Sequence, residues 1–141
     1  MLSSLMYVSK RSANCHQEEV IDIFRSSERN NKKANITGIL LYSDTLFIHY
    51  LEGDFDQINQ LYDKIKTDYR HKHIFIIEII PVKERKFPDH PMIIRSFNLQ
   101  NSIFWHLLDN EDAKSLQSIL EQYSQTGDKI LSMIERILYL H

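Results

Sequence analysis

Three polar residues stand at the ends of apolar stripes on two predicted helices. The stripe of the first helix, over residues 17–31, ends in Asn30 and Asn31, and the stripe of the second, over residues 54–67, leads to Asp68. Buried amides and carboxylates need hydrogen-bond partners, which a polar heterocycle held between the helices would supply. The alternative is that these side chains cap backbone carbonyls at the helix ends or face water.

A tyrosine and a histidine lie on predicted strands among apolar neighbours. The alternation of residues 2–9 places Tyr7 on one defined face of its strand, and His49 shares a face with Phe47 and Leu51. Either side chain could place a hydrogen-bonding tip in the layer between the sheet and the helices. The alternative is that each is a core residue whose polar atom is satisfied within the protein.

Other patterns that could carry chemistry are weak. The histidines that could be grouped into a metal cluster are His49, His71, His73 and His90, but their spacing matches no metal-site template, and no cysteine or ordered carboxylate completes a ligand set. The sequence has neither a glycine-rich phosphate loop nor a nucleophile elbow. We therefore expect no metal site and no enzymatic activity.

The elements that would position these residues follow from periodicity and turn signals. Strands are predicted over residues 2–9, 35–43, 45–52, 73–82 and 91–99. Asp54 predicts the start of the second helix, because it can accept from the first helical amides and Gln57 follows three residues later. The order β-α-β-β-α-β-β predicts an α+β fold, a ferredoxin-like sandwich with both helices on one face of the sheet.

A C-terminal helical extension follows the sandwich. Apolar positions mark one helix around Leu116 to Tyr123 and another around Ile130 to Leu138, with Gly127 between them. The second is apolar around more than half of its circumference, so we expect it to bury surface against the open sheet face or another copy of the chain. We thus divide the chain into a domain over residues 1–99 and helices over residues 100–141 for output or oligomerisation.

Length and composition indicate one globular domain. The chain has 141 residues, of which 43% are hydrophobic and 26% charged, which is typical of proteins that bury a core. A net charge of −2 with scattered positive residues argues against nucleic-acid binding. The single Cys15 and an N-terminus without a signal-peptide pattern favour the cytoplasm, and no apolar run is long enough to span a membrane.

Taken together, several short blocks resemble the BLUF family of flavin-binding blue-light sensors. The blocks are Met6-Tyr7, Arg29-Asn30-Asn31, the run from Asn35 to Tyr42, Leu51-Glu52-Gly53, and Asp68 to His71. The most specific is N-N-x-x-x-x-I-T-G-x-L-x-Y, followed at the family's distance by F-x-x-x-L-E-G. The resemblance covers about residues 1 to 97.

The resemblance implies a cofactor and the residues around it. In that family a flavin, usually FAD, lies between the two helices over the sheet, and Tyr7 matches the tyrosine that donates an electron and a proton to it. The positions that match flavin contacts are Ile23, Asn30, Asn31, Lys64, Ile65, Asp68, Arg70 and His71. Branched aliphatic side chains suit the faces of a planar ring, and amides suit its polar edge.

The chain departs from the family at the positions of the light-driven hydrogen-bond switch. Where the family has a glutamine that bridges the tyrosine and the flavin, this chain has His49, and where a tryptophan precedes Ser-Met it has His90-Pro91-Met92. An imidazole can donate and accept, but it has no carboxamide to rotate or tautomerise. The resemblance therefore implies a photoactive group of Tyr7, His49, His90 and Met92 with an altered or absent normal photocycle.

We expect a sensory protein that binds FAD, or else FMN, and signals through protein contacts. With only about 40 residues after the sandwich, a cyclase or phosphodiesterase module has no room, so the expected partners are copies of the chain and an unidentified downstream protein. The alternative is a flavin-free interaction domain that has kept the fold and lost the photochemistry. Purified protein that is yellow would distinguish the first hypothesis from the second.

Overall fold

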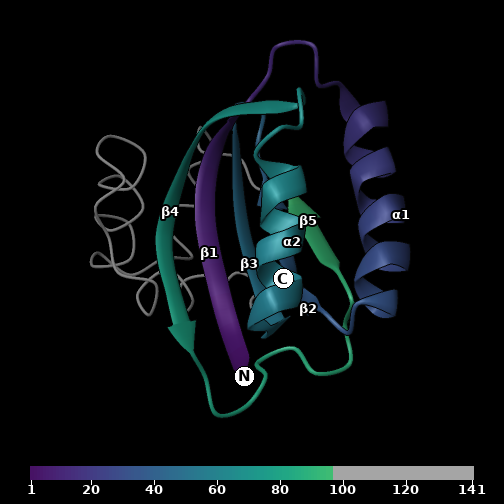
Figure 1. The fold of residues 1–141 in the computed structure, drawn as a ribbon. Coiled ribbons are helices and arrows are strands. Elements are labelled where there is room, and N and C mark those ends of the chain that lie inside the picture. Colours follow the sequence, from purple (N-terminus) through teal and green to yellow (C-terminus); the bar gives the residue numbers. More distant parts are fainter. Residues whose placement is uncertain (97–141) are drawn as a thin grey trace, which may run out of the picture.

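The computed structural model of the chain describes residues 1–96. Its elements, in chain order, are β1 (Leu2–Arg11), α1 (Gln17–Lys33), β2 (Thr37–Tyr42), β3 (Leu46–Asp54), α2 (Phe55–Ile65), β4 (His71–Pro81) and β5 (Ile93–Ser96). The two helices lie side by side on one face of the sheet (Figure 1). The C-terminal helices predicted over residues 100–141 lie outside the described residues.

The strands form one five-stranded sheet in the order β4-β1-β3-β2-β5. The first four pair antiparallel, which is the ferredoxin-like order, and β5 adds to the outer edge of β2 in parallel. The predicted α+β fold is confirmed. Strand β5 begins two residues later than expected, because Pro91 has no N–H to donate to a ladder and its carbonyl bonds the side chain of Asn31 instead.

The helices begin where the sequence indicates, but their ends differ from the prediction. Asp54 caps α2, since its carboxylate accepts the backbone N–H of Asp56 at 3.2 Å. Helix α2 ends at Ile65, two residues before the predicted end, because the chain tightens there and the N–H of Thr67 bonds the carbonyl of Lys64. None of the helices described within residues 1–96 is long and apolar enough to cross a membrane.

The core between sheet and helices is built from side chains of the central strands and the inward side chains of both helices. Leu5, Leu40 and Leu51 from the sheet are buried against Val20 of α1 and Ile58 of α2. Each fully buried side chain of this size contributes roughly 1.5–3 kcal/mol through the removal of apolar surface from water. The helices are therefore held over the sheet by a continuous apolar layer.

Two local features bring β2 close to β3. Asn35 precedes β2 with φ of 55°, the left-handed conformation that asparagine tolerates better than most residues. Gly38 lies where a Cβ would be 2.1 Å from the carbonyl oxygen of Tyr50 on β3, so only glycine fits between the two strands. At Gly53 a Cβ would instead meet the side chain of Ile36 at 3.1 Å and, less closely, the carbonyl oxygen of Asn35 at 3.3 Å.

This difference predicts unequal effects of adding a methyl group at the two glycines. Gly38→Ala should lower the free energy of unfolding by about 3 kcal/mol, because the clash is with backbone, whereas Gly53→Ala should cost about 1 kcal/mol, because a side-chain methylene can move. Urea unfolding followed by circular dichroism measures both. Equal costs would contradict the close approach at Gly38.

Candidate functional site

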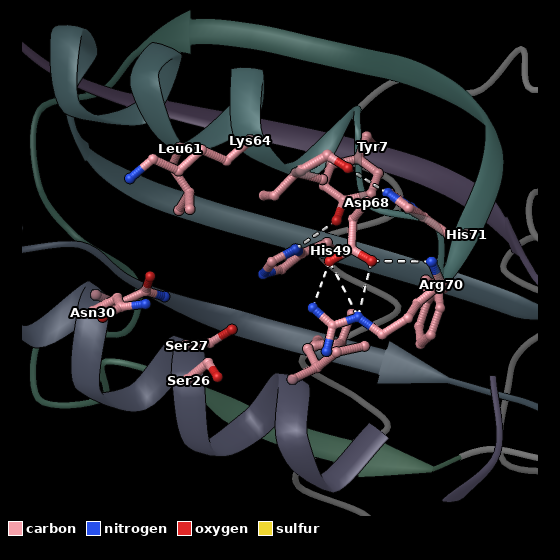
Figure 2. Close-up of a pocket in the computed structure, with 15 residues that line it drawn as sticks. Tyr7, Ser26, Ser27, Asn30, His49, Leu61, Lys64, Asp68, Arg70 and His71 are labelled. Carbon is pink, nitrogen blue, oxygen red and sulfur yellow. Dashed lines mark hydrogen bonds and ion pairs between the residues drawn. The ribbon is translucent and has the colours of Figure 1, made fainter. Parts of the chain in front are cut away.

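A cavity lies between α1 and α2 above the central strands. Its volume is about 190 Å³, whereas one water needs only ~10–15 Å³ by the same measure, so it is too large to be a packing defect. Its apolar walls are formed by Ile23, Leu40, Phe47, Leu61 and Ile65, and its polar lining by Tyr7, Ser26, Ser27, Asn30, Asn31, His49, Lys64, Asp68, Arg70 and His71. Figure 2 shows side chains of α1 and α2 on opposite sides of the cavity.

The floor of the cavity holds a buried pair, Tyr7 of β1 and His49 of β3. The two residues are directly opposite each other in the antiparallel register, so both side chains point to the helix face. The Tyr7 hydroxyl lies 2.9 Å from Nδ1 of His49, and their rings meet edge to face with centroids 5.3 Å apart. The sequence placed both residues on strands but could not show that they are partners.

Burial decides the protonation of this pair. Burial, and then the charge of Asp68, raises the pKa of Tyr7 far above its usual value, so the phenol keeps its proton. Burial, and then the charge of His71, lowers the pKa of His49 to about 3, so the imidazole is neutral. A phenol O–H is a stronger hydrogen-bond donor than the N–H of a neutral imidazole, so we assign the hydroxyl as the donor to Nδ1, which leaves the ring proton on Nε2.

The second ring nitrogen of His49 has no hydrogen-bond partner. Among the residues that the structure describes, Nε2 is the buried side-chain polar atom left without one. It lies on the side of the ring away from Tyr7, where the ring lines the cavity (Figure 2). A buried donor without a partner is costly, about 1–3 kcal/mol, so the site is chemically suited to a ligand with an acceptor at this point.

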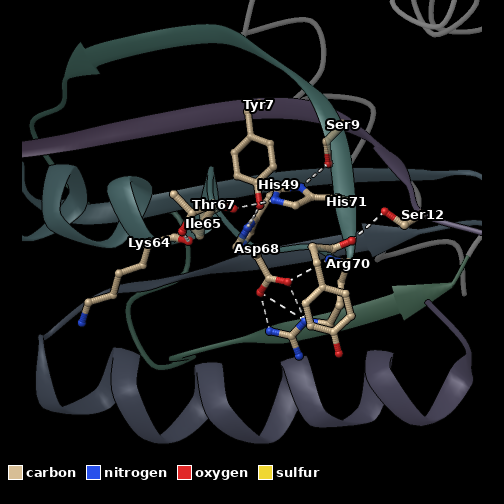
Figure 3. Close-up of polar contacts among 11 residues, drawn as sticks. Tyr7, Ser9, Ser12, His49, Lys64, Ile65, Thr67, Asp68, Arg70 and His71 are labelled. Carbon is tan, nitrogen blue, oxygen red and sulfur yellow. Dashed lines mark hydrogen bonds and ion pairs between the residues drawn. The ribbon is translucent and has the colours of Figure 1, made fainter. Parts of the chain in front are cut away.

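The loop after α2 carries an ion pair beside the cavity. The carboxylate of Asp68 accepts from Nε of Arg70 at 2.8 Å, from Nη2, and from the backbone N–H of Arg70 at 2.9 Å (Figure 3). Burial works against ionisation of Asp68, but these bonds outweigh it and hold its pKa below the usual range. The expectation that Asp68 continues the helix stripe is met only in part, because the helix ends before it.

His71, at the start of β4, is held between two elements. Nε2 lies 2.6 Å from the carbonyl oxygen of Ile65, and Nδ1 lies 2.8 Å from the hydroxyl of Ser9 (Figure 3). Its ring is also 6.0 Å from that of Tyr7, measured between centroids. His71 therefore joins the end of α2 to β1 beside the buried pair.

The two amides of α1 differ in environment. Asn31 is 2% exposed, and its Nδ2 donates to the carbonyl oxygen of Pro91 at 3.0 Å. Asn30 lines the cavity but is exposed, as is Lys64 on α2. The buried amide is thus tied to the loop between β4 and β5, whereas the exposed amide and the lysine lie towards solvent.

Two of the expected photoactive residues do not line the cavity. Met92 is buried in the core cluster, and His90 is exposed, with its carbonyl oxygen accepting the N–H of Gly38 at 3.1 Å. Their places depend on how the β4–β5 loop folds back on β2, which local sequence does not specify.

Several lining residues were not among the expected contacts. They are Ser26, Ser27, Leu40, Phe47 and Leu61. Ser27 and Leu61 belong to the inward stripes of their helices, and Phe47 shares the face of His49, so the same periodicities could have identified them.

Comparisons with known proteins agree with this architecture. The sequence model of the family described as sensors of blue-light using FAD matches residues 2–93. The beta subunit of photoactivated adenylate cyclase from Euglena gracilis is 32% identical over 124 residues, which are 86% of this chain and 14% of that protein. The blue light- and temperature-regulated antirepressor BluF of Escherichia coli (strain K12) is 31% identical over 74 residues, 52% of this chain and 18% of that protein.

Solved structures of BLUF proteins are similar to this chain. The dark-state structure of BlrB, a BLUF protein, has a TM-score of 0.72 at 28% identity and covers 97% of this chain and 94% of that one. The photo-activated state of BlsA has a TM-score of 0.81 at 22% identity, covers 98% of this chain and 95% of that one, and shows the common fold. The chain spans only a small part of the curated relatives, 14% in the Euglena gracilis cyclase subunit. From the match over residues 2–93 and the shared architecture, the chain belongs to the BLUF family of flavin-based blue-light sensors.

Proposed function

We propose that this chain binds FAD in the cavity between α1 and α2 and responds to blue light with an altered photocycle. The observation that carries the proposal is the unpartnered Nε2 of His49, a buried donor on a ring that lines the cavity and is bonded through its other nitrogen to Tyr7. A flavin ring offers acceptors along one edge, so it would satisfy this donor. FMN shares that ring and is the alternative cofactor.

The lining residues fit such a ligand by chemical type. Ile23 of α1 and Ile65 of α2 line the cavity from its two helices, which suits the two faces of a planar ring. We assign Asn30 and Asn31 to the polar edge of the ring. We assign Asp68 and His71 to positions near the ring. The cations of the lining, Lys64 and Arg70, are suited to the ribityl and phosphate chain.

The chemistry divides between the cofactor and the buried pair. A bound flavin supplies blue-light absorption and an excited state that takes up an electron. Tyr7 is the donor in this proposal, and because its hydroxyl already bonds Nδ1 of neutral His49, the phenol proton passes to that nitrogen when an electron leaves the ring. Return of the electron returns the proton to Tyr7.

His49 cannot perform the switch that a glutamine performs. A carboxamide that turns over still presents a polar atom to each neighbour, with donor and acceptor exchanged. An imidazole that turns over places Cδ2 where Nδ1 was, so it loses the bond to Tyr7. We therefore propose that His49 bridges Tyr7 and the ligand and has no second orientation that keeps the bond to Tyr7.

Output is the remaining part of the proposal. BLUF proteins signal to partner effectors, and the relatives named above combine the domain with a cyclase or act as an antirepressor. We propose that this chain is not itself an enzyme and signals by contact with a protein partner, including other copies of itself. The described residues do not include the C-terminal helices to which we assign that contact.

Flavin binding is the first test. FAD added in excess during refolding should remain with the protein through gel filtration and give the visible flavin spectrum. Ser27→Trp, which fills the cavity from α1, should weaken binding by about 100-fold or more, since a bulky ring would take the ligand's place. Arg25→Trp, on the exposed side of the same helix, should bind as the parent does. A colourless parent protein would refute the flavin site and favour the flavin-free interaction domain.

The bridge predicts a specific response to light. The parent protein with FAD should show quenched flavin fluorescence and return to its starting spectrum without a long-lived red-shifted state. His49→Gln should introduce a slowly reversing red shift under blue light, and Tyr7→Phe in that background should remove it. Absorption spectra before and after illumination decide the matter, and a slow red shift in the parent protein would count against the bridge.

Neutral His49 also predicts a dependence of stability on pH in the flavin-free protein. An unfolded histidine takes up a proton near pH 6.5, whereas folded His49 does so only near pH 3, so acid favours the unfolded state between these values. The free energy of unfolding should therefore fall by about 2 kcal/mol between about pH 7 and about pH 5 on account of His49. Urea unfolding of His49→Gln over the same range is the control. An equal loss in both proteins would mean that His49 is not held neutral.

A further inference from the structure

A fully buried carboxylate lies on the face of the sheet opposite the cavity. Glu52 is 0% exposed, and it follows Leu51 on β3, so it points away from the helices. Its oxygens accept from the hydroxyls of Thr37 at 3.2 Å and Tyr50 at 3.1 Å, and from the backbone N–H groups of Lys86 at 2.8 Å and Phe87 at 2.6 Å. Glu52 thus satisfies donors from the sheet and from the loop between β4 and β5.

The same loop is fastened at a second point. Nη1 of Arg85 donates to the hydroxyl of Thr37 and to the carbonyl oxygen of Glu52, and Nη2 donates to the carbonyl oxygen of Asn35 at 2.7 Å. Phe87 is buried and packs edge to face on Tyr50, with centroids 5.8 Å apart. Residues 85–87 are therefore held firmly to β2 and β3.

Four residues beyond Phe87 the loop contacts Asn31, which lines the cavity. The carbonyl oxygen of His90 accepts the N–H of Gly38, and the carbonyl oxygen of Pro91 accepts Nδ2 of Asn31 at 3.0 Å. When one N–H of an amide is held by a fixed acceptor, the oxygen and the second hydrogen of that amide each point in a fixed direction. The orientation of Asn31 therefore depends on where the loop places Pro91.

We propose that Glu52 is a positioning residue for Asn31, and so for the ligand edge that Asn31 contacts. The inference rests on the proposed flavin site. Glu52 acts from the far side of the sheet, because its carboxylate fixes the backbone of residues 86 and 87 and thereby the carbonyl that orients the amide. A glutamine at this position would turn an NH₂ group towards N–H donors or lose them as partners, which loosens the loop.

A double-mutant cycle tests the connection in the full chain. Glu52→Gln should raise the Kd for FAD by about 3- to 10-fold, and Asn31→Ala by a similar factor. The double variant should bind no more weakly than Asn31→Ala, because the effect of Glu52 passes through the amide. Ile48→Val, which trims a buried side chain of the same strand without touching the loop's hydrogen bonds, should leave the Kd unchanged. Multiplied effects in the double variant would overturn the proposal.

A second measurement separates this inference from the flavin site itself. In flavin-free protein, the side-chain amide signals of Asn31 in NMR spectra should show one hydrogen protected from exchange, and Glu52→Gln should remove the protection while Ile48→Val retains it. Parent protein that binds no FAD refutes the flavin site, but the amide signals still decide the role of Glu52. If Glu52→Gln does not fold, Arg85→Met loosens the same loop and should have the same effect. An unchanged Asn31 signal in a folded variant would overturn the proposal.

Discussion

The hydrogen bond from the Tyr7 hydroxyl to Nδ1 of His49 is the interaction on which the site depends. It exists because β1 and β3 pair in a register that sets these residues opposite each other, on the face that the helices cover. A slip of one residue between the two strands would place the two side chains on opposite faces of the sheet. Each group would then lose its partner, at a cost of about 1–3 kcal/mol for each one left buried and unsatisfied. The register between β1 and β3 thus also determines which hydrogen bond forms at the floor of the cavity.

Burial keeps the pair neutral, and the charges around it act in the same direction. Asp68 lies near enough to raise the pKa of Tyr7, and its carboxylate is bound by Arg70. His71 further disfavours a positive charge on His49. A neutral imidazole has one acceptor and one donor, and because Tyr7 occupies the acceptor, only the donor remains for the cavity. Because burial keeps His49 neutral, the ring nitrogen that faces the cavity is a donor. The site therefore favours a ligand that presents an acceptor at this point.

Strand β3 carries buried polar groups on both of its faces. His49 lines the cavity on one face. Three residues later, Glu52 accepts hydrogen bonds from four donors on the other face. A buried carboxylate is tolerated only when its oxygens are satisfied, and here two of the donors come from a loop with no regular structure. The loop gains a defined position from the sheet, and the amide of Asn31 gains a fixed acceptor from the loop. The two faces are connected through backbone.

Local patterns in the sequence determined much of the fold and the identity of the family. Alternation located the strands, the helical stripes located Ile23 and Ile65, and Asp54 and Asn35 occupy the cap and the left-handed position that their chemistry suits. These features depend on residues within one or two turns of each other.

Contacts between distant segments were decided only by the tertiary structure. The bond between Tyr7 and His49 joins residues 42 apart, and the bond between Asn31 and Pro91 joins residues 60 apart. The parallel pairing of β5 with β2, the burial of Met92 in the core and the four donors of Glu52 belong to the same class. Such contacts arise from register and loop path, and these follow from the packing of the whole domain and not from the preferences of any single segment.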